Sequence, residues 1–596
     1  MCGFIGIASK EKIRSSNLES ENKRIICRGP DETKYVKEES SDLSLELIFN
    51  RLSILELSQY GSQPLISKDK NYLLMFNGEI FNYIELKKYL EKYNIVYNSK
   101  NSDSEVLFHG LINEGHSFID KLIGQFSIVF IDKLKKDILL IRDRTGQKPL
   151  FFTNDTKNLY FSSNLISLSK ISDQKEIDNF GLEEFLNLGV VTSPNTIFQH
   201  IKKVSPGEIV KFNFSKSITK KIYKYWDPLE IISEKRNFND KDFDELISNS
   251  IEIRLRSDVP VAAFCSGGLD STLIIKNLNE LGSEVPTFSV VNRNPKYDER
   301  NYISLVTNKY NTKNIFKEID SETTFENILE NIENFDEPYM DASNQPSSFI
   351  AKEISSKFKV AISGDGGDEI FFGYKRFQNE FNLNKKLKHI INLIYKMYPG
   401  WLGTGNKILK FSSDYVESYS SYFEDKKFLK VLGLSDKTNF KEKYLNNSKN
   451  KFKNLMMVEN RFYLSEMMNL KVDRTSMMHS LEVRSPFVDH RLFEYLLSCK
   501  TNTIHYKTSK KYVKDILKKD FNNDFLDREK MGFVFDLEKL IYDNEVKIRE
   551  ILIKSQLKKY IPKFDINKLF LRKSRINSQR IYKLIILARF LEYGRF

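Results

Sequence analysis

Short apolar or alternating runs dominate residues 1–212, as in YLLMFNGEI, GQFSIVFID, DILLIRD and NLYFSS. Clusters of glycine, asparagine, aspartate or lysine bound each run, which is the pattern of antiparallel strands joined by turns. Apolar residues at helical spacing intervene in NYIELKKYLEKY and SEVLFHGLINEG. The pattern predicts an α+β domain over residues 1–212, built on antiparallel sheets.

A change of pattern separates this region from the rest of the chain. Residues 213–236 include SKSITKK and YWDP, hold few apolar positions and are predicted to be a linker. VPVAAFCSGG then places a buried strand before a glycine turn, and the helical LDSTLIIKNLNELG and a second strand, VPTFSVV, follow. KFKVAISGDGGDE repeats the strand-to-turn form. This spacing predicts an α/β domain with a parallel sheet over residues 237–596, mostly helical after Glu380.

Composition narrows the class of protein without assigning a function. The 596 residues favour at least two domains, and 40% apolar residues suffice for sizeable cores. Seven histidines form no HExxH motif. Four cysteines are too few and too scattered for a disulfide framework or a CxxC metal site: Cys2, Cys27, Cys265 and Cys499. These counts argue against a zinc enzyme and predict a reducing, cytoplasmic setting.

The apolar stretches are too short or too interrupted for a membrane span. FSIVFIDKLKKDILLI comes closest, but lysines and aspartates divide it, so it predicts a β-hairpin. The opening MCGFIGIASK lacks a basic region and ends its apolar run at Lys10, unlike a signal peptide. We expect no membrane partner.

A net charge of +13 and a pI near 9.0 raise nucleic acid as a partner. The basic residues are spread along the chain, however, and form no compact block interleaved with aromatic residues. A diffuse bias of composition explains the charge, so we expect no nucleic-acid partner.

The hexapeptide SGGLDS, from Ser266 to Ser271, directly follows a predicted strand and opens a helix. Gly267 and Gly268 allow a tight turn whose N–H groups approach an anion, and the helix N-terminus adds partial positive charge. The two serines can donate to phosphate oxygens. Asp270 would repel a bare phosphate but fits one that is bridged by Mg²⁺. An ordinary glycine-rich turn is the alternative.

The heptapeptide SGDGGDE, from Ser363 to Glu369, also ends a predicted strand. Three acids around three glycines are costly unless a cation sits among them. Because the carboxyl ends of parallel strands share one crevice, Asp270 and Asp368 are expected to face the same Mg²⁺. A metal-free surface turn is the alternative.

These motifs resemble a known family. SGGLDS is similar to the pyrophosphate loop of the PP-loop ATP pyrophosphatases, which adenylate their substrates and release pyrophosphate. With SGDGGDE and VDRTSMMHSLEVRSPFVDHRL it closely resembles the synthetase domain of glutamine-hydrolysing asparagine synthetases. MCGFIGI, RGPDE, NRLSILEL, FNGEIFNY, SDSEVL and RDRTGQKPLFF resemble the N-terminal-nucleophile glutaminase domain of that family. The resemblance runs from Met1 to Phe533 and implies a four-layer αββα sandwich followed by a PP-loop domain.

The resemblance explains why a cysteine stands at position 2. A free thiol of pKa about 8.5 is mostly protonated at neutral pH, and an α-amino group of pKa about 8 can take its proton. Removal of Met1 would therefore leave nucleophile and base on one residue. Gly3 is expected to let the substrate approach the backbone. An incidental cysteine beside an uncleaved methionine is the alternative.

The glutamine pocket implied by the family has five residues besides Cys2. Arg51 would pair with the glutamine α-carboxylate, a task suited to a guanidinium. Glu79 and Asp103 would hold the α-ammonium. The Asn77 side chain and the Gly78 N–H would form the oxyanion hole, which makes both catalytic and Asn77 also a glutamine-binding residue.

In the second domain the family implies an ATP site with Mg²⁺. The implied ATP-binding residues are Cys265, Ser266, Gly267, Gly268, Asp270, Ser271, Val290, Ser363 and Gly364. Asp270 and Asp368 would bind the metal. Asp365 would be catalytic near a β-aspartyl intermediate, although many relatives carry the longer Glu there. Cys265 replaces a usual aliphatic residue, and Asn164 stands where relatives often have Glu.

Residues between the two sites are expected to organise walls rather than to touch substrate. Arg28 and Asp31 would organise the wall of the glutamine pocket. Lys471, Asp473 and Arg474 lie in a family signature and would shape the wall between the sites. A buried ion-pair network is the alternative for these last three residues.

The resulting hypothesis is a two-site enzyme that makes asparagine from aspartate, ATP and ammonia released from glutamine. The motifs define ATP and glutamine better than the acceptor, so another carboxylate, such as a sugar acid or a modified peptide, stays open. An RNA-modifying PP-loop enzyme and a protein that has lost activity are further alternatives. The oligomeric state stays open, with a homodimer as one arrangement.

Overall fold

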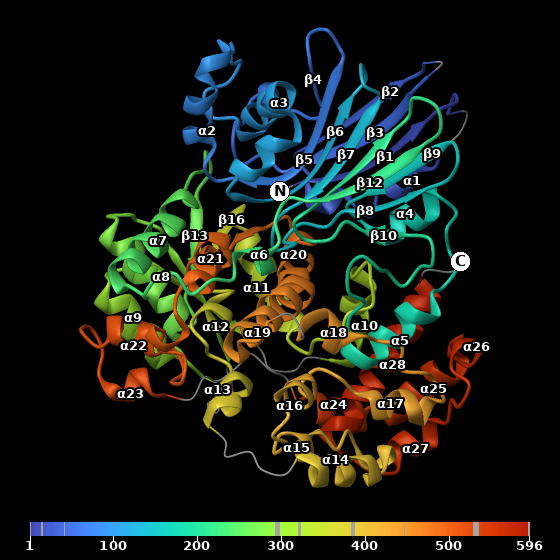
Figure 1. The fold of residues 1–596 in the computed structure, drawn as a ribbon, viewed down its shortest axis with the longest axis vertical. Coiled ribbons are helices and arrows are strands. Elements are labelled where there is room, and N and C mark those ends of the chain that lie inside the picture. Colours follow the sequence, from blue (N-terminus) through green and yellow to red (C-terminus); the bar gives the residue numbers. More distant parts are fainter. Residues whose placement is uncertain are drawn as a thin grey trace.

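The computed structural model describes residues 2–13, 16–40, 42–292, 298–319, 324–382, 388–445, 448–528 and 536–593. A sandwich of long strands forms the upper part of the molecule in Figure 1, and a mainly helical part around a smaller sheet lies below it. None of the helices in the described ranges is long and apolar enough to cross a membrane.

Two six-stranded antiparallel sheets form the N-terminal region. The first has the order β10-β8-β9-β1-β3-β2: β10 (Lys202–Lys203), β8 (Phe151–Asn154), β9 (Asn158–Ser162), β1 (Gly3–Ser9), β3 (Ser44–Arg51) and β2 (Glu32–Glu38). The second has the order β12-β11-β7-β6-β5-β4: β12 (Thr219–Lys224), β11 (Glu208–Asn213), β7 (Asp137–Arg142), β6 (Gly124–Asp132), β5 (Tyr72–Ile80) and β4 (Leu65–Ile66). The predicted hairpin is confirmed, because Asp132 pairs with Asp137 where β6 turns into β7.

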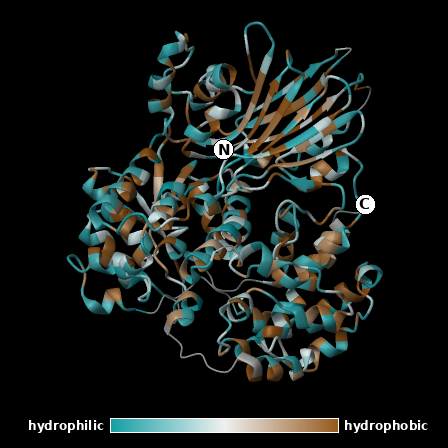
Figure 2. Ribbon diagram, in the orientation of Figure 1, coloured by the Kyte–Doolittle hydropathy of each residue, from teal (hydrophilic) through white to brown (hydrophobic). Residues whose placement is uncertain are grey.

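Strand β1 shows why this sequence makes a sandwich. Phe4 and Ala8 point into the core between the two sheets, whereas Ile5 and Ile7 point to the outer face of the first sheet. Both faces of the strand are buried, so its apolar run is nearly continuous rather than alternating. The strands are correspondingly hydrophobic in Figure 2.

Helices cover the outer face of each sheet. α1 (Leu18–Asn22) and α4 (Leu165–Ile171) pack on the first sheet, and α2 (Tyr83–Tyr89) and α3 (Asp103–Glu114) lie beside the second. The predicted four-layer αββα sandwich is confirmed.

A five-stranded parallel sheet forms the centre of the second region. Its order is β15-β14-β13-β16-β17: β15 (Asn314–Ile319), β14 (Thr287–Asn292), β13 (Val261–Phe264), β16 (Val360–Ile362) and β17 (Glu482–Arg484). The chain order reverses between β13 and β16, which are neighbours. In an open parallel sheet this switch point is where the loops diverge and leave a crevice for a ligand.

The rest of the second region is mainly helical, as the sequence predicts. α20 (Asn469–Met477) continues a π-helix, Val458–Met468, and leads into β17. The helices after Asp536 belong to this helical part. They also share a core with the N-terminal region, where Phe185 and Phe198 contact the cluster that includes α28 (Arg575–Tyr593).

The stretch predicted to be a linker is partly ordered. Residues 219–224 form β12, which pairs along its length with β11 at the edge of the second sheet. Asp227 then caps the short helix α6 (Pro228–Ile231). The sequence pattern was misleading here because β12 is an exposed edge strand with few apolar residues.

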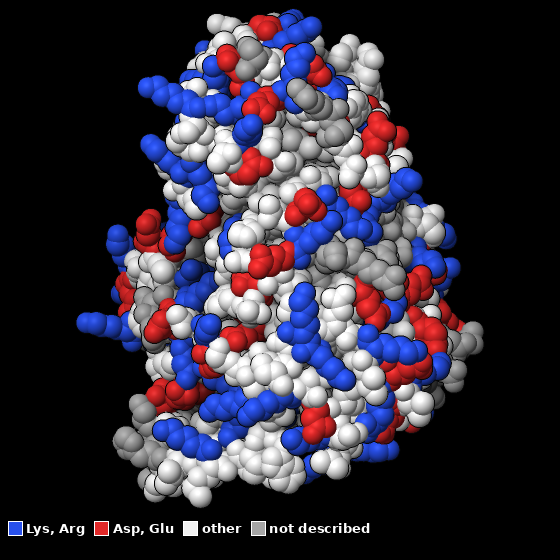
Figure 3. Space-filling view, turned by 90° about the vertical axis from the view of Figure 1, so that its right-hand side faces the viewer, with Lys and Arg blue, Asp and Glu red and all other residues white. Residues whose placement is uncertain are grey.

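Charged side chains of both signs lie on the surface. On the face shown in Figure 3, acidic and basic side chains are intermixed.

Candidate active sites

Cys2 lies where β1 begins, and its side chain belongs to the core between the sheets. Only 7% of the residue is exposed. Its backbone N–H donates to Asn77 Oδ1 at 3.0 Å, and its carbonyl accepts a hydrogen bond from Arg28 Nε at 3.1 Å. A side chain at Gly3 would come within 2.4 Å of Ile25, so the glycine is required by the packing of the turn that carries Arg28.

The surroundings of Cys2 favour the protonated form of its thiol, so a base is needed to form the thiolate. Burial raises the pKa of the thiol above its ordinary value. The amino group at the start of the chain, a hydrogen bond from the Leu52 backbone and the Arg51 guanidinium act in the opposite direction. The thiol therefore stays protonated until a group beside it accepts the proton, and the Cys2 α-amino group that removal of Met1 would expose stays the predicted base.

Two buried acids face the same region from β5 and α3. Glu79 is 2% exposed, and burial raises its pKa well above the ordinary value against the attraction of Arg484, whose Nη2 lies 3.3 Å from Glu79 Oε2. Burial raises the pKa of Asp103 to about 6, although the Ile80 N–H donates to its Oδ2 at 3.0 Å. Among the described residues, Glu79 Oε1 has no hydrogen-bond partner. The pair fits a ligand that brings an ammonium group.

Arg51 is placed by β3 and held by the loop that follows. Its Nη1 donates to the Ser58 carbonyl at 3.0 Å and lies 3.4 Å from Glu32 Oε2, and its Nη2 donates to the Glu56 carbonyl. The guanidinium is buried within the loop, so this arrangement fixes its position beside Cys2.

Gly78 follows Asn77 in β5 and has a φ of +149°. A side chain there would come within 1.9 Å of the Gln125 carbonyl, so only glycine fits. The Cys2 thiol, the Cys2 backbone N–H and the Asn77 side-chain amide thus lie together in a buried region. This combination suits acyl transfer from an amide substrate.

A cavity of about 740 Å³ opens at the switch point of the parallel sheet. Its lining includes Ser266, Gly268, Asp270, Ser271, Ser363, Gly364, Asp365 and Asp368 from the two predicted loops. The two loops can approach closely because a glycine lies at their point of contact. A Cβ atom at Gly367 would lie 2.6 Å from Asp270 Cγ. The structure therefore brings together most of the predicted ATP-binding residues.

Three predicted ATP-binding residues do not line this cavity. Cys265 is 2% exposed, and burial raises its pKa to about 11. Val290 lies in the apolar cluster of β14 with Phe288. Gly267 turns the chain with a φ of +67°. Cys265 and Val290 are thus buried in the core, and Gly267 is a turn residue of the loop itself.

A lysine joins the two predicted metal ligands. Lys510 Nζ lies 2.5 Å from Asp270 Oδ2 and 2.6 Å from Asp368 Oδ1. The two carboxylates therefore converge on one cation, the Lys510 ammonium, and their role as Mg²⁺ ligands stays a prediction. Lys510 stands in TSKKYVKD, a segment with no recognisable motif, so sequence reasoning missed it.

Lys471 and Asp365 also line the cavity. Lys471 Nζ donates to Ser343 Oγ at 3.1 Å and lies 3.6 Å from Asp341 Oδ2. Burial acts to lower the pKa of Lys471, but Asp341 and Asp365 outweigh it and raise the pKa. Asp365 accepts a hydrogen bond from Ser363 at 2.8 Å. The lining of the cavity thus includes both a basic and an acidic side chain.

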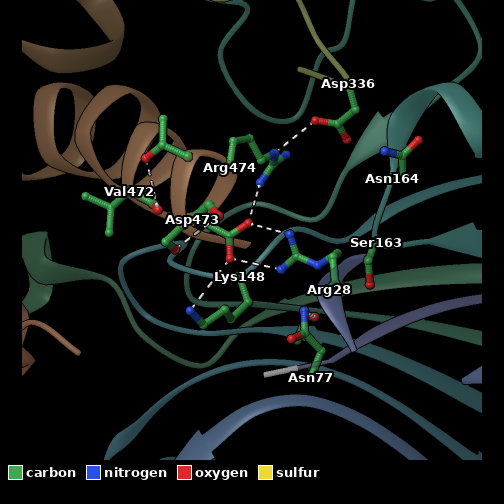
Figure 4. A network of polar contacts seen from close by, with 12 residues as sticks. Arg28, Asn77, Lys148, Ser163, Asn164, Asp336, Val472, Asp473 and Arg474 are labelled. Atoms are coloured by element: carbon green, nitrogen blue, oxygen red, sulfur yellow. Dashed lines mark hydrogen bonds and ion pairs between the residues drawn. The ribbon is translucent and has the colours of Figure 1, made fainter. Parts of the chain in front are cut away.

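A network of buried charges connects the two halves of the chain (Figure 4). Arg28 forms two hydrogen bonds with Asp473, at 2.8 and 2.9 Å. Asp473 also accepts from Arg474 at 3.1 Å, and Arg474 in turn donates to Asp336 at 2.9 Å and to Glu337 at 3.1 Å. Asp473 and Arg474 thus belong to a buried ion-pair network, which was the alternative for them, and their place in a wall between two sites stays a prediction.

Asp31, a predicted wall residue, and Asn164, which stands where relatives often have Glu, take other places. Asp31 accepts hydrogen bonds from Lys359 at 2.7 Å and from the Ser53 N–H at 2.7 Å, at the junction of the two halves. Asn164 caps α4 by accepting from the Ser167 N–H at 2.9 Å, and does not reach the ion-pair network through any bond drawn in Figure 4.

Sequence reasoning also missed the role of β17 in the first site. Its Arg484 contacts Glu79, and its Glu482 lies near the start of the chain, whose amino group helps to lower the pKa of Glu482 to about 2 against the effect of burial. Both residues stand in SLEVRSPFVD, a motif that the sequence analysis identified. The motif does not indicate that these two side chains contact the N-terminal region.

Two family models match the chain. The model described as Asparagine synthase covers residues 242–585, and the model described as Glutamine amidotransferase domain covers residues 1–226. The glutamine-hydrolyzing asparagine synthetase 1 of Bacillus subtilis strain 168 is 30% identical over 596 aligned residues, which cover 94% of this chain and 92% of that protein. The glutamine-hydrolyzing asparagine synthetase 3 of the same organism is 28% identical over 533 residues, covering 83% of this chain and 80% of that protein.

Proposed function

Since the chain belongs to the asparagine synthase family, we propose that it makes asparagine from aspartate and ATP with ammonia released from glutamine. We further propose a glutaminase domain over residues 1–212, a connection over 213–236 and a synthetase domain over 237–596. The observation that carries the proposal is that one chain holds two candidate sites. The buried Cys2–Asn77 pair lies in the N-terminal region, and the Asp270–Lys510–Asp368 cluster lies in the second region.

In the first half-reaction Cys2, freed of Met1, is the nucleophile. Its α-amino group takes the thiol proton, and the sulfur attacks the side-chain amide carbon of glutamine. Asn77 and the Gly78 N–H would stabilise the oxyanion that forms. Ammonia leaves with a proton from the amine, and water then hydrolyses the γ-glutamyl thioester to glutamate.

Recognition of glutamine would follow the charges of the pocket. Arg51 would hold the α-carboxylate, and Glu79 and Asp103 would hold the α-ammonium. The raised pKa of each acid reflects buried negative charge that the ammonium of the substrate would balance.

In the second half-reaction an oxygen of the aspartate β-carboxylate attacks the α-phosphorus of ATP, and pyrophosphate leaves. The N–H groups and hydroxyls of the Ser266–Ser271 loop would bind the phosphates. Ammonia then attacks the activated carbonyl carbon, and AMP leaves with the bonding electron pair. Asp365 and Lys471, which face this space, would orient the β-aspartyl group.

Asp270 and Asp368 are the described residues that would hold a Mg²⁺ ion. Asp270 and Asp368 already share one cation, Lys510, so their geometry accepts positive charge. No cluster of three or more potential metal ligands exists among the described residues, so ATP phosphates and water would complete the coordination. Mg²⁺ bound there would neutralise charge on the phosphates.

A pyrophosphate assay tests the acceptor. Purified protein with glutamine, ATP and Mg²⁺ should release pyrophosphate only when aspartate is added, in step with asparagine. Pyrophosphate release that ignores aspartate but responds to another carboxylate would refute asparagine synthesis and leave the two-site chemistry in place.

A further inference from the structure

We infer that Asp473, a residue of the ATP-binding half, positions the nucleophile Cys2 through Arg28. The inference rests on the proposed role of Cys2 and adds a positioning residue to that site. Asp473 does not touch the glutamine pocket itself; its carboxylate holds the side chain that binds the Cys2 carbonyl.

The geometry of Arg28 is the first step. The guanidinium uses both of its amino groups on the two oxygens of Asp473, and its remaining Nε–H on the Cys2 carbonyl. Among the described residues, these are the hydrogen bonds of the Arg28 side chain. Since a guanidinium is planar, two bonds to Asp473 fix the direction of the third. The carbonyl of Cys2 is thereby held from the other half of the chain.

The charge of Asp473 is secured by its neighbours. The residue is 2% exposed, and its pKa is lowered well below the ordinary value because Arg28, Lys148 and Arg474 outweigh the effect of burial. Lys148 Nζ lies 3.7 Å from Asp473 Oδ1. Asp473 therefore stays ionised, and Figure 4 shows it at the centre of the three cations.

The outer contacts anchor this centre at two further points. Arg474 donates to Asp336, whose other oxygen accepts from the Leu165 N–H of α4 at 2.8 Å. Lys203 pairs with Glu337, which also accepts from Arg474. Each anion of the network is thus bound to both halves, which limits the ways in which Asp473 can move.

Helix α20 presents different faces to the two sites. Lys471, Val472, Thr475 and Ser476 line the 740 Å³ cavity. Asp473 faces the glutaminase half, and Met477 packs with Leu52 and Ile54, which follow Arg51. A single helix therefore contributes to the wall of one site and to the support of the other.

The position of Cys2 has to be fixed because its amine and its thiol must both reach one amide group. The N–H is bound by Asn77 and the carbonyl by Arg28, so one residue is held at both ends. Without the Asp473 carboxylate, Arg28 and Lys148 would be left as buried cations and would repel each other, and the carbonyl would lose its fixed donor.

The experiment compares Asp473→Asn with Asp489→Asn in the full-length protein. Asp489 is also 2% exposed and pairs with Arg254 at 3.0 Å and with Arg491 at 2.9 Å, but these ion pairs are separate from the Asp473 network and lie in the synthetase half. Glutamate release from glutamine is measured without ATP or aspartate, and pyrophosphate release is measured with ammonium in place of glutamine. The melting temperature of each variant is recorded.

For Asp473→Asn we expect kcat of glutamate release to fall on the order of 10²-fold, with KM for glutamine changed much less. Ammonium-dependent pyrophosphate release should stay at the level of Asp489→Asn. Labelling of Cys2 by an electrophilic glutamine analogue should slow in parallel with kcat, and Asp473→Glu should recover part of both rates.

Two outcomes would overturn the inference. One is glutamate release by Asp473→Asn at the wild-type rate. The other is equal loss of both activities, matched by Asp489→Asn, which would mean a structural role only. If Asp473→Asn does not fold, the labelling rate of the folded Asp473→Glu variant decides. Wild-type protein that releases no glutamate would instead refute the proposed function of Cys2, so the two failures are distinguishable.

Discussion

The two sites of this chain handle buried charge in opposite ways. In the glutamine pocket Glu79 and Asp103 are buried with raised pKa values, and Arg484 balances only part of their charge. In the ATP cavity Asp270 and Asp368 hold a cation from the protein itself, Lys510. The carboxylates of the first site would be balanced by a positive charge from the substrate, whereas those of the second site are already balanced by Lys510.

The difference suggests how each site selects its ligand. An unbalanced pair of buried acids gains most from a ligand with an ammonium group, because burial penalises the charged acids until a positive charge balances them. The open cavity instead offers a charged wall to a large polyanion and its metal. Under the proposed function, specificity for glutamine would be electrostatic, whereas binding of ATP would depend on the shape of the loops and their N–H groups.

The largest expected effect is a complete loss of one activity while the other is retained. Cys2→Ala should reduce glutamine-dependent synthesis to the limit of detection, because the nucleophile is gone. Ammonium-dependent synthesis should persist. Cys27→Ala, which changes a half-buried cysteine outside the pocket, is the matched control and should keep both activities. Undiminished glutamate release by Cys2→Ala would contradict the assignment.

Asp270→Asn should act on the other site alone. Loss of one of two carboxylates that converge on a cation should lower aspartate-dependent pyrophosphate release on the order of 10²-fold, as removal of a preorganised charge does elsewhere. Glutamate release should be unchanged. Asp527→Asn is the control, because Asp527 lines the same cavity but is mostly exposed. Equal effects of the two variants would argue against a metal role for Asp270.

Glu79→Gln should weaken glutamine binding rather than turnover. A charge-assisted contact to an ammonium group contributes about 1.5–3 kcal/mol, so KM for glutamine should rise roughly 10- to 100-fold. Steady-state measurement of glutamate release gives kcat and KM separately. A fall in kcat at constant KM would contradict a binding role for Glu79.

The smallest expected effect is a pH dependence. Because the pKa of Asp103 is about 6, lowering the pH from 7 to 5 should reduce kcat/KM for glutamine by roughly tenfold as the carboxylate is protonated. The Asp103→Asn variant should have a lower kcat/KM for glutamine at pH 7, and its kcat/KM should not change between pH 7 and pH 5.

The raised pKa of Asp103 also affects stability. The folded state keeps the proton of Asp103 to a higher pH than the unfolded state does, so the contribution of Asp103 to the free energy of unfolding falls as the pH rises from about 4 to about 6. Denaturant unfolding at both pH values measures this loss, which Asp103→Asn should abolish.

Much of this picture could be predicted from local sequence. The hairpin around Lys133, the strand-to-glycine turns and the convergence of Asp270 and Asp368 all follow from spacing within a few residues or from the rule for parallel strands. These features are local or topological, so one sequence suffices for them.

Contacts across the junction could not be predicted in the same way. Arg28 and Asp473 are 445 positions apart, and nothing in either motif specifies the other. Lys510 lies in a segment without a motif, and the edge strand β12 lacks the apolar pattern by which strands are found. Such features depend on how distant segments pack, which spacing along the chain does not encode.

The most direct test of the two-site account follows the nitrogen atom. Glutamine whose amide nitrogen carries the heavy isotope is supplied with ATP, Mg²⁺, aspartate and unlabelled ammonium, and the product is analysed by mass spectrometry. We predict asparagine with the heavy nitrogen in its side-chain amide, and loss of that label in Cys2→Ala while unlabelled asparagine persists. Asparagine that carries only unlabelled nitrogen with the wild-type protein would contradict the account.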